Sequence, residues 1–149
     1  MMYFDAAYIA KCYLNEPHAD RVRKLAYTAS ELSSCELAKI EFLSVVRHHV
    51  REHRLTHEEA GQIFQKFEEH TETGLWQWLP VTMDLITATA ARMKQLPDAL
   101  ILRTLDALHL TCAQRNGFHE IFTNDRNMLM AAGYFDLETR NVLASHSPS

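Results

Sequence analysis

Four acidic residues stand beside apolar segments, where solvated side chains are not expected. Asp5 and Asp125 each follow a short apolar run. Glu41 borders the apolar face of a helical pattern, and Asp106 begins another. Carboxylates that converge raise one another's pKa unless a cation offsets their repulsion. An all-oxygen set favours Mg²⁺ or Mn²⁺ over zinc, and such an ion can activate water for attack on a phosphodiester. Phosphoryl chemistry is therefore the leading hypothesis, provided that the four meet.

Each of these acids also has a simpler explanation when it is taken alone. Asp5 could cap the turn after its strand, and Glu41 could pair with a neighbouring lysine. Asp106 and Asp125 could each be a helix N-cap. These alternatives stay open, and the joint placement of the four residues is the better evidence.

The first half of the chain predicts one strand and several helices. Residues 2–5 form a buried strand that leads directly into a helical turn, which places Asp5 at the carboxyl end of the strand. A helix follows with Pro17 in its first turn. The S-x-x-E pattern of residues 33–36 predicts a capping box that begins the helix carrying Glu41. A second box at residues 56–59 begins another helix, so that the two form a hairpin.

The second half alternates strands with helices. A strand around residues 76–81 precedes a helix capped by Thr82, which ends before Pro97-Asp98. Residues 105–116 form the next helix, residues 121–123 a strand, and residues 135–143 a weak final strand. This order predicts an α/β fold with a central parallel sheet covered by helices on both faces. The carboxyl ends of parallel strands share one edge, where ligands usually bind.

Length and composition agree with one globular domain. The 149 residues are 47% hydrophobic with four glycines and four prolines, which excludes a collagen-like or low-complexity chain. We expect a domain over residues 1–144 and a polar tail over residues 145–149. The net charge of −4 means that any nucleic acid must be attracted by a local patch. Three scattered cysteines indicate reduced thiols in the cytoplasm, and no leader or membrane segment is expected.

The segments around the four acids together resemble a PIN domain, specifically a VapC-like toxin nuclease. The resemblance covers residues 2 to about 135. It is carried by Tyr3-Phe4-Asp5, the segment from Glu36 to Glu41, Leu105-Asp106-Ala107-Leu108-His109-Leu110, and Phe122-Thr123-Asn124-Asp125-Arg126.

The resemblance implies a three-layer α/β/α fold and a Mg²⁺- or Mn²⁺-dependent endoribonuclease that hydrolyses RNA. It also implies a homodimer and a cognate antitoxin protein encoded by a neighbouring gene. Asp5, Asp106 and Asp125 would then hold the metal. Glu41 would bind it directly or orient the attacking water, and Thr123 would support the site through its hydroxyl.

The chain departs from the family pattern at two places. Ala6 and Ala7 follow Asp5 where family members commonly have hydroxyl residues, and Cys35 stands where a serine is frequent. The missing hydroxyl could weaken metal affinity. Two other functions therefore stay open, which are a PIN-like module that binds protein or RNA without catalysis and an RNA-processing nuclease without an antitoxin.

Basic and apolar side chains suggest further roles. Arg103, Arg115 and Arg126 flank the acidic residues and could hold a substrate phosphate or form structural ion pairs. His109 could form an acid/base pair with Asp106, although a packed histidine with a hydrogen-bonded ring is favoured. The row of His49, His53 and His57 is a weak zinc candidate, since the capping box interrupts it, and the basic stretch around it could touch RNA phosphates. Apolar residues of the hairpin over 34–70 are expected to form a dimer or antitoxin surface.

Overall fold

Residues 1–144 of the computed structural model form a parallel sheet of five short strands; the predicted polar tail, 145–149, lies outside the described residues. The strands are β1 (Met2–Tyr3), β2 (Leu32–Cys35), β3 (Trp76–Leu79), β4 (Glu120–Phe122) and β5 (Glu138–Arg140). β1 pairs with β2 and β2 with β3, while β4 pairs with β5. A single bridge between Phe4 and Phe122 joins the two parts, so the order is β3-β2-β1-β4-β5.

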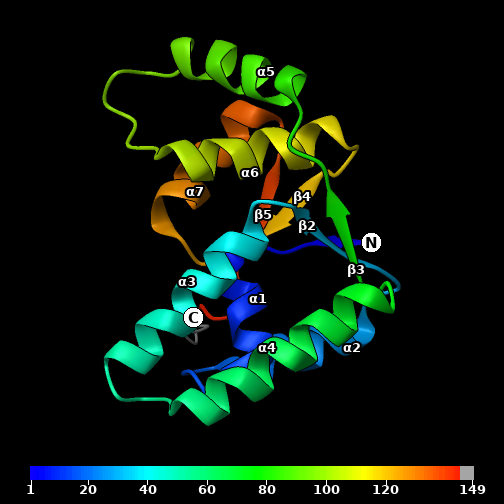
Figure 1. The fold of residues 1–149 in the computed structure, drawn as a ribbon. Helices are drawn as coiled ribbons and strands as arrows, with labels where there is room; N and C mark the ends of the chain where they lie inside the picture. Colours follow the sequence, from blue (N-terminus) through cyan, green and yellow to red (C-terminus); the bar gives the residue numbers. More distant parts are fainter. Residues whose placement is uncertain (145–149) are drawn as a thin grey trace, which may run out of the picture.

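Helices cover both faces of this sheet. They are α1 (Ala6–Tyr13), α2 (Ala19–Thr28), α3 (Ala38–Arg51), α4 (His57–Glu72), α5 (Met83–Lys94), α6 (Thr104–Arg115), α7 (Arg126–Ala131) and the 3-10 helix η1 (Ala132–Phe135). Figure 1 shows α1 to α4 grouped in one half of the molecule and α5 to α7 in the other. The predicted three-layer α/β/α fold is confirmed.

The alternation of side chains along β1 separates two apolar clusters. Phe4, directly after β1, packs against Tyr8 and Trp76 and belongs to the cluster formed with α1, α3 and α4. Tyr3, on the opposite face, belongs to the cluster formed with α6, α7 and η1. Because successive side chains of a strand point to opposite faces, two adjacent aromatic residues hold a helical layer on each side.

The capping box expected at residues 33–36 is wrong, because Leu32–Cys35 is the buried strand β2. This strand pairs on both sides, with β1 and with β3, which supplies hydrogen bonds that a helix start would not. The Ser34 hydroxyl donates to the carbonyl of Phe4 at 2.7 Å instead of capping a helix. α3 begins later, at Ala38, and still carries Glu41 in its first turn.

The other boundaries are closer to expectation. The Thr56–Glu59 capping box and the Thr82 cap are both present. α2 begins at Ala19, so Pro17 precedes the helix, because His18 takes a left-handed conformation as N-cap. The final strand is shortened to Glu138–Arg140, since residues 132–135 form η1. In the described part of the chain no helix is both long and apolar enough to cross a membrane.

Candidate active site

Asp5 is a buried carboxylate at the carboxyl end of β1. Its side chain is the N-cap of α1 and accepts from the backbone N–H of Tyr8 at 2.9 Å. Its second oxygen accepts from the hydroxyl of Thr123. Only 4% of the residue is exposed. Burial raises the pKa of Asp5 to about 6 although these hydrogen bonds lower it, and the charge of Glu41 adds to the rise.

Thr123 links Asp5 to Asp125 across the end of β4. Its hydroxyl donates to Asp5 and accepts from the backbone N–H of Asp125 at 3.0 Å. Asp125 in turn is the N-cap of α7 and accepts from the N–H of Met128 at 2.9 Å. The capping interpretation is thus confirmed for Asp5 and Asp125. Capping also fixes the two side chains at one edge of the sheet, so helix capping and the expected metal binding are compatible roles.

Asp106 lies half-buried in the first turn of α6. The N-cap of this helix is Arg103, so the N-cap interpretation of Asp106 is wrong. Burial raises the pKa of Asp106, and the charges of Asp125 and Glu41 raise it further. His109 and Arg103 lower it in part. Carboxylates from three different elements therefore repel one another here.

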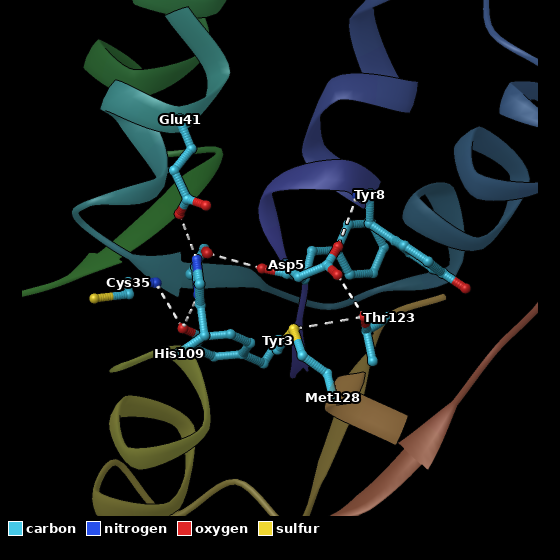
Figure 2. Close-up of polar contacts among 10 residues, drawn as sticks. Tyr3, Asp5, Tyr8, Cys35, Glu41, His109, Thr123 and Met128 are labelled. Atoms are coloured by element: carbon cyan, nitrogen blue, oxygen red, sulfur yellow. Dashed lines mark hydrogen bonds and ion pairs between the residues drawn. The ribbon is translucent and has the colours of Figure 1, made fainter. Parts of the chain in front are cut away.

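Glu41 pairs with His109 and not with a lysine. The ring Nε2 of His109 lies 2.6 Å from Oε1 of Glu41, and Nδ1 lies 2.7 Å from the hydroxyl oxygen of Tyr3 (Figure 2). The expected packed, hydrogen-bonded histidine is confirmed, with Tyr3 and Glu41 as its partners in place of Asp106. Burial lowers the pKa of His109, but the hydrogen bond and charge of Glu41, together with Asp5 and Cys35, raise it overall.

The four acidic residues come from four elements and influence one another's charge, but they do not converge into a finished ligand set. Within residues 1–144, no three His, Cys, Asp or Glu side chains form a group that could hold a metal ion. That finding includes the histidine row, where His49 faces Glu16 at 3.7 Å and His53 lies in the turn after α3.

The donor chemistry of the four nevertheless suits a hard divalent cation. All are carboxylates, and those of Asp5 and Asp106 have raised pKa values to which other acids of the set contribute. A cation beside them would relieve this repulsion.

The three arginines are placed differently from one another. Arg103 and Arg126 are exposed at the starts of α6 and α7, three residues before Asp106 and directly after Asp125 in the chain. Arg115 lies at the far end of α6 and pairs with Asp84 on the surface. The ion-pair interpretation is therefore confirmed for Arg115, while Arg103 and Arg126 remain candidates for binding phosphate.

Neither departure from the family pattern leaves a polar group of the site without a partner. Asp5 has donors from Thr123 and Tyr8 although Ala6 carries no hydroxyl. The backbone N–H of Cys35 donates to the Tyr3 hydroxyl at 3.1 Å. Sequence reasoning missed Tyr3 as a polar member of the site. The available signal was a tyrosine inside a buried strand, since its hydroxyl needs a buried partner.

Comparison with known families agrees with this geometry. The model of the PIN domain family matches residues 2–133, and the chain belongs to that family. PIN domains are in general nucleases that use divalent metal ions. No curated protein gives a significant match to the sequence.

Proposed function

We propose that this protein is a Mg²⁺- or Mn²⁺-dependent endoribonuclease that hydrolyses RNA phosphodiester bonds. The observation that carries the proposal is the buried Asp5 carboxylate, whose pKa is raised to about 6 at a sheet edge shared with three further acids. The hydrogen bonds from Tyr8 and Thr123 offset only part of the cost of burying this carboxylate, because its pKa is still raised, so a functional reason for the burial is favoured. Membership in the PIN family supports nuclease chemistry as that reason.

The placement of each residue supports a separate role in the proposed reaction. Asp5, Asp106 and Asp125 would hold the metal, and Glu41 would bind it or orient the water. When bound, the metal supplies charge for the developing negative oxygens and acidifies the attacking water. Thr123 fixes the orientation of Asp5 through its hydroxyl. The exposed guanidinium groups of Arg103 and Arg126 would bind the phosphates of the RNA.

Cleavage of RNA by the purified protein with Mn²⁺ tests this proposal. We expect Asp5→Asn to lower the rate by roughly a hundredfold or more, because the metal contributes several kcal/mol to such reactions. The matched control is Asp98→Asn, which removes an exposed acid in the loop before α6 and leaves cleavage unchanged. Equal cutting by Asp5→Asn and the wild type would reject the site.

As part of the same proposal, the protein acts in the cytoplasm as the toxin of a type II toxin–antitoxin pair and forms a homodimer. An arginine of the antitoxin would enter the acidic site and compete with the metal. Exposed apolar side chains of the hairpin, Ile40 at 72% and Leu43 at 42%, support a protein partner there. Salt-sensitive inhibition by the product of an adjacent small gene is the expected result. The absence of such a gene would favour a processing nuclease instead.

A second candidate is a PIN-like binding module without catalysis. It is favoured by the finding that, in the described residues, no three potential ligands form a metal-binding group. The apolar side chain of Ala6 next to Asp5 favours it as well. Calorimetric titration with Mn²⁺ separates the two candidates, because a binding module takes up no Mn²⁺ at millimolar concentration.

A further inference from the structure

A series of three hydrogen bonds connects the backbone of β2 to the Glu41 carboxylate. The N–H of Cys35 donates to the hydroxyl oxygen of Tyr3 at 3.1 Å. This hydroxyl lies 2.7 Å from Nδ1 of His109, and Nε2 of His109 lies 2.6 Å from Oε1 of Glu41. Figure 2 shows the series beside Asp5. These hydrogen bonds connect Glu41, which belongs to α3, to β1, β2 and α6.

The carboxylate at one end of the series determines the direction of the bond between His109 and Glu41. A carboxylate only accepts, so Nε2 of His109 carries a proton; in the neutral ring Nδ1 is then unprotonated and accepts from the Tyr3 hydroxyl. A charged ring carries a proton on both nitrogens, so Nδ1 then donates to the Tyr3 hydroxyl while Nε2 still donates to Glu41. The bond to Glu41 therefore forms in either charge state of the ring.

Burial makes this series rigid. Tyr3 is fully buried and His109 is 1% exposed, so water does not compete for their bonds. A glutamate side chain free in solvent samples many rotamers, and ordering it costs conformational entropy. The bond from His109 selects one orientation of Glu41 before any ligand arrives. Within residues 1–144, no hydrogen bond engages Oε2 of Glu41, which leaves that oxygen available.

We propose that Tyr3 and His109 are positioning residues that hold the Glu41 carboxylate ready for a divalent cation or its bound water, with Oε2 as the acting oxygen. This role rests on the proposed metal-dependent function and extends it to two residues that touch neither substrate nor metal. Partners that orient a metal ligand in this way are typically worth about 10- to 100-fold in metal affinity or activity.

A double-mutant cycle measured by calorimetric Mn²⁺ binding tests the proposal. Tyr3→Phe and His109→Leu are each made in the wild type and in a Glu41→Gln background. We expect each to weaken Mn²⁺ binding by about 10- to 100-fold in the wild type. In the Glu41→Gln background the same changes have almost no further effect. His109→Gln, which keeps a donor toward Glu41, retains more affinity than His109→Leu.

The matched control is Tyr13→Phe. Tyr13 makes a hydrogen bond to His70 of the same length, 2.7 Å, away from the acidic residues. It is expected to lower thermal stability much as Tyr3→Phe does and to leave Mn²⁺ binding unchanged. Circular dichroism melting of all variants confirms that each is folded at the titration temperature.

The outcomes separate this inference from the proposed function. A wild type that binds no Mn²⁺ overturns the function and this role with it. A wild type that binds Mn²⁺, with equal losses in the presence and absence of Glu41, overturns the positioning role alone. The ¹⁵N spectrum of the histidine rings gives a readout independent of metal, in which His109 is expected to carry a proton on Nε2. An unprotonated Nε2 contradicts the bond to Glu41.

Discussion

The same pair of side chains occurs twice in this fold, in two regions that use it differently. Tyr3 and His109 are joined at 2.7 Å beside the acidic residues, and Tyr13 and His70 are joined at 2.7 Å between α1 and α4. In the first region the remaining ring nitrogen meets the carboxylate of Glu41. In the second, the hydroxyl of Tyr13 also accepts from the indole N–H of Trp76 at 2.8 Å.

The charge of the surroundings explains the difference between the two histidines. Burial lowers the pKa of His70, and the positive charge of Lys66 lowers it further. Burial also lowers the pKa of His109, but the contact with Glu41 reverses the sign. The third partner therefore distinguishes the two tyrosine–histidine pairs. The pair that also contacts Trp76 is structural, whereas the pair that also contacts Glu41 belongs to the acidic site. The aromatic region around Tyr13, Phe42 and Phe67 packs rings against one another, whereas in the acidic region burial and neighbouring carboxylates raise the pKa values of Asp5 and Asp106.

Removing a stacked ring from the aromatic region gives the largest expected effect on stability. Phe67 stacks on Phe42 with ring centroids 4.3 Å apart and is 5% exposed. Phe67→Ala is expected to lower the free energy of unfolding by about 3–5 kcal/mol. Denaturant titration measures this loss. At a temperature where the variant is folded, RNA cleavage per folded molecule stays at the wild-type value, and a lower value would contradict the separation of the two regions.

In the absence of metal, Asp5→Asn is expected to remove a loss of stability that the wild type shows as the pH rises. Because folding raises the pKa of Asp5 from 3.8 to about 6, the folded state favours the protonated form. The stabilisation from this group is complete below about pH 4 and is lost as the pH rises to about 6, with a magnitude of about 3 kcal/mol. The asparagine variant cannot ionise, so it loses none of this stability.

Unfolding of the wild type and Asp5→Asn in the presence of a chelator, at pH 4 and pH 8, measures the effect. The difference in unfolding free energy between the two proteins should shift by about 3 kcal/mol in favour of the variant between these pH values. Asp98→Asn serves as control and shows no such shift. A constant difference would mean that Asp5 ionises as readily in the fold as in the unfolded chain.

The smallest effect is expected for a charge outside both regions. Arg115 and Asp84 form an ion pair at the surface, between α6 and α5. Because water and salt screen such pairs, Arg115→Gln should change the unfolding free energy by less than about 1 kcal/mol. RNA cleavage and its dependence on substrate concentration should be unchanged. A raised KM would return Arg115 to the candidates for phosphate binding.

The sequence predicted the fold and the positions of the acids better than the contacts among them. Periodicity and capping located α4, α5 and α6, because those signals are local. The prediction from sequence failed at β2, where the polar residues Ser33 and Ser34 lie in a buried strand. Their burial is explained only by the pairing of β2 with β1 and β3. The bond between Glu41 and His109 joins residues 68 positions apart, and no local pattern encodes it.

One bridge, between Phe4 and Phe122, holds the two parts of the sheet together, and Asp5 follows it directly. The backbone N–H of Asp5 donates to the carbonyl of Phe122 at 3.2 Å, and this hydrogen bond is part of the bridge, which is the seam between the two parts of the sheet. Glu41 follows β2 on one side of the seam, and Asp125 follows β4 on the other. A small shear along the seam would therefore alter the spacing of the carboxylates while leaving each half of the sheet intact.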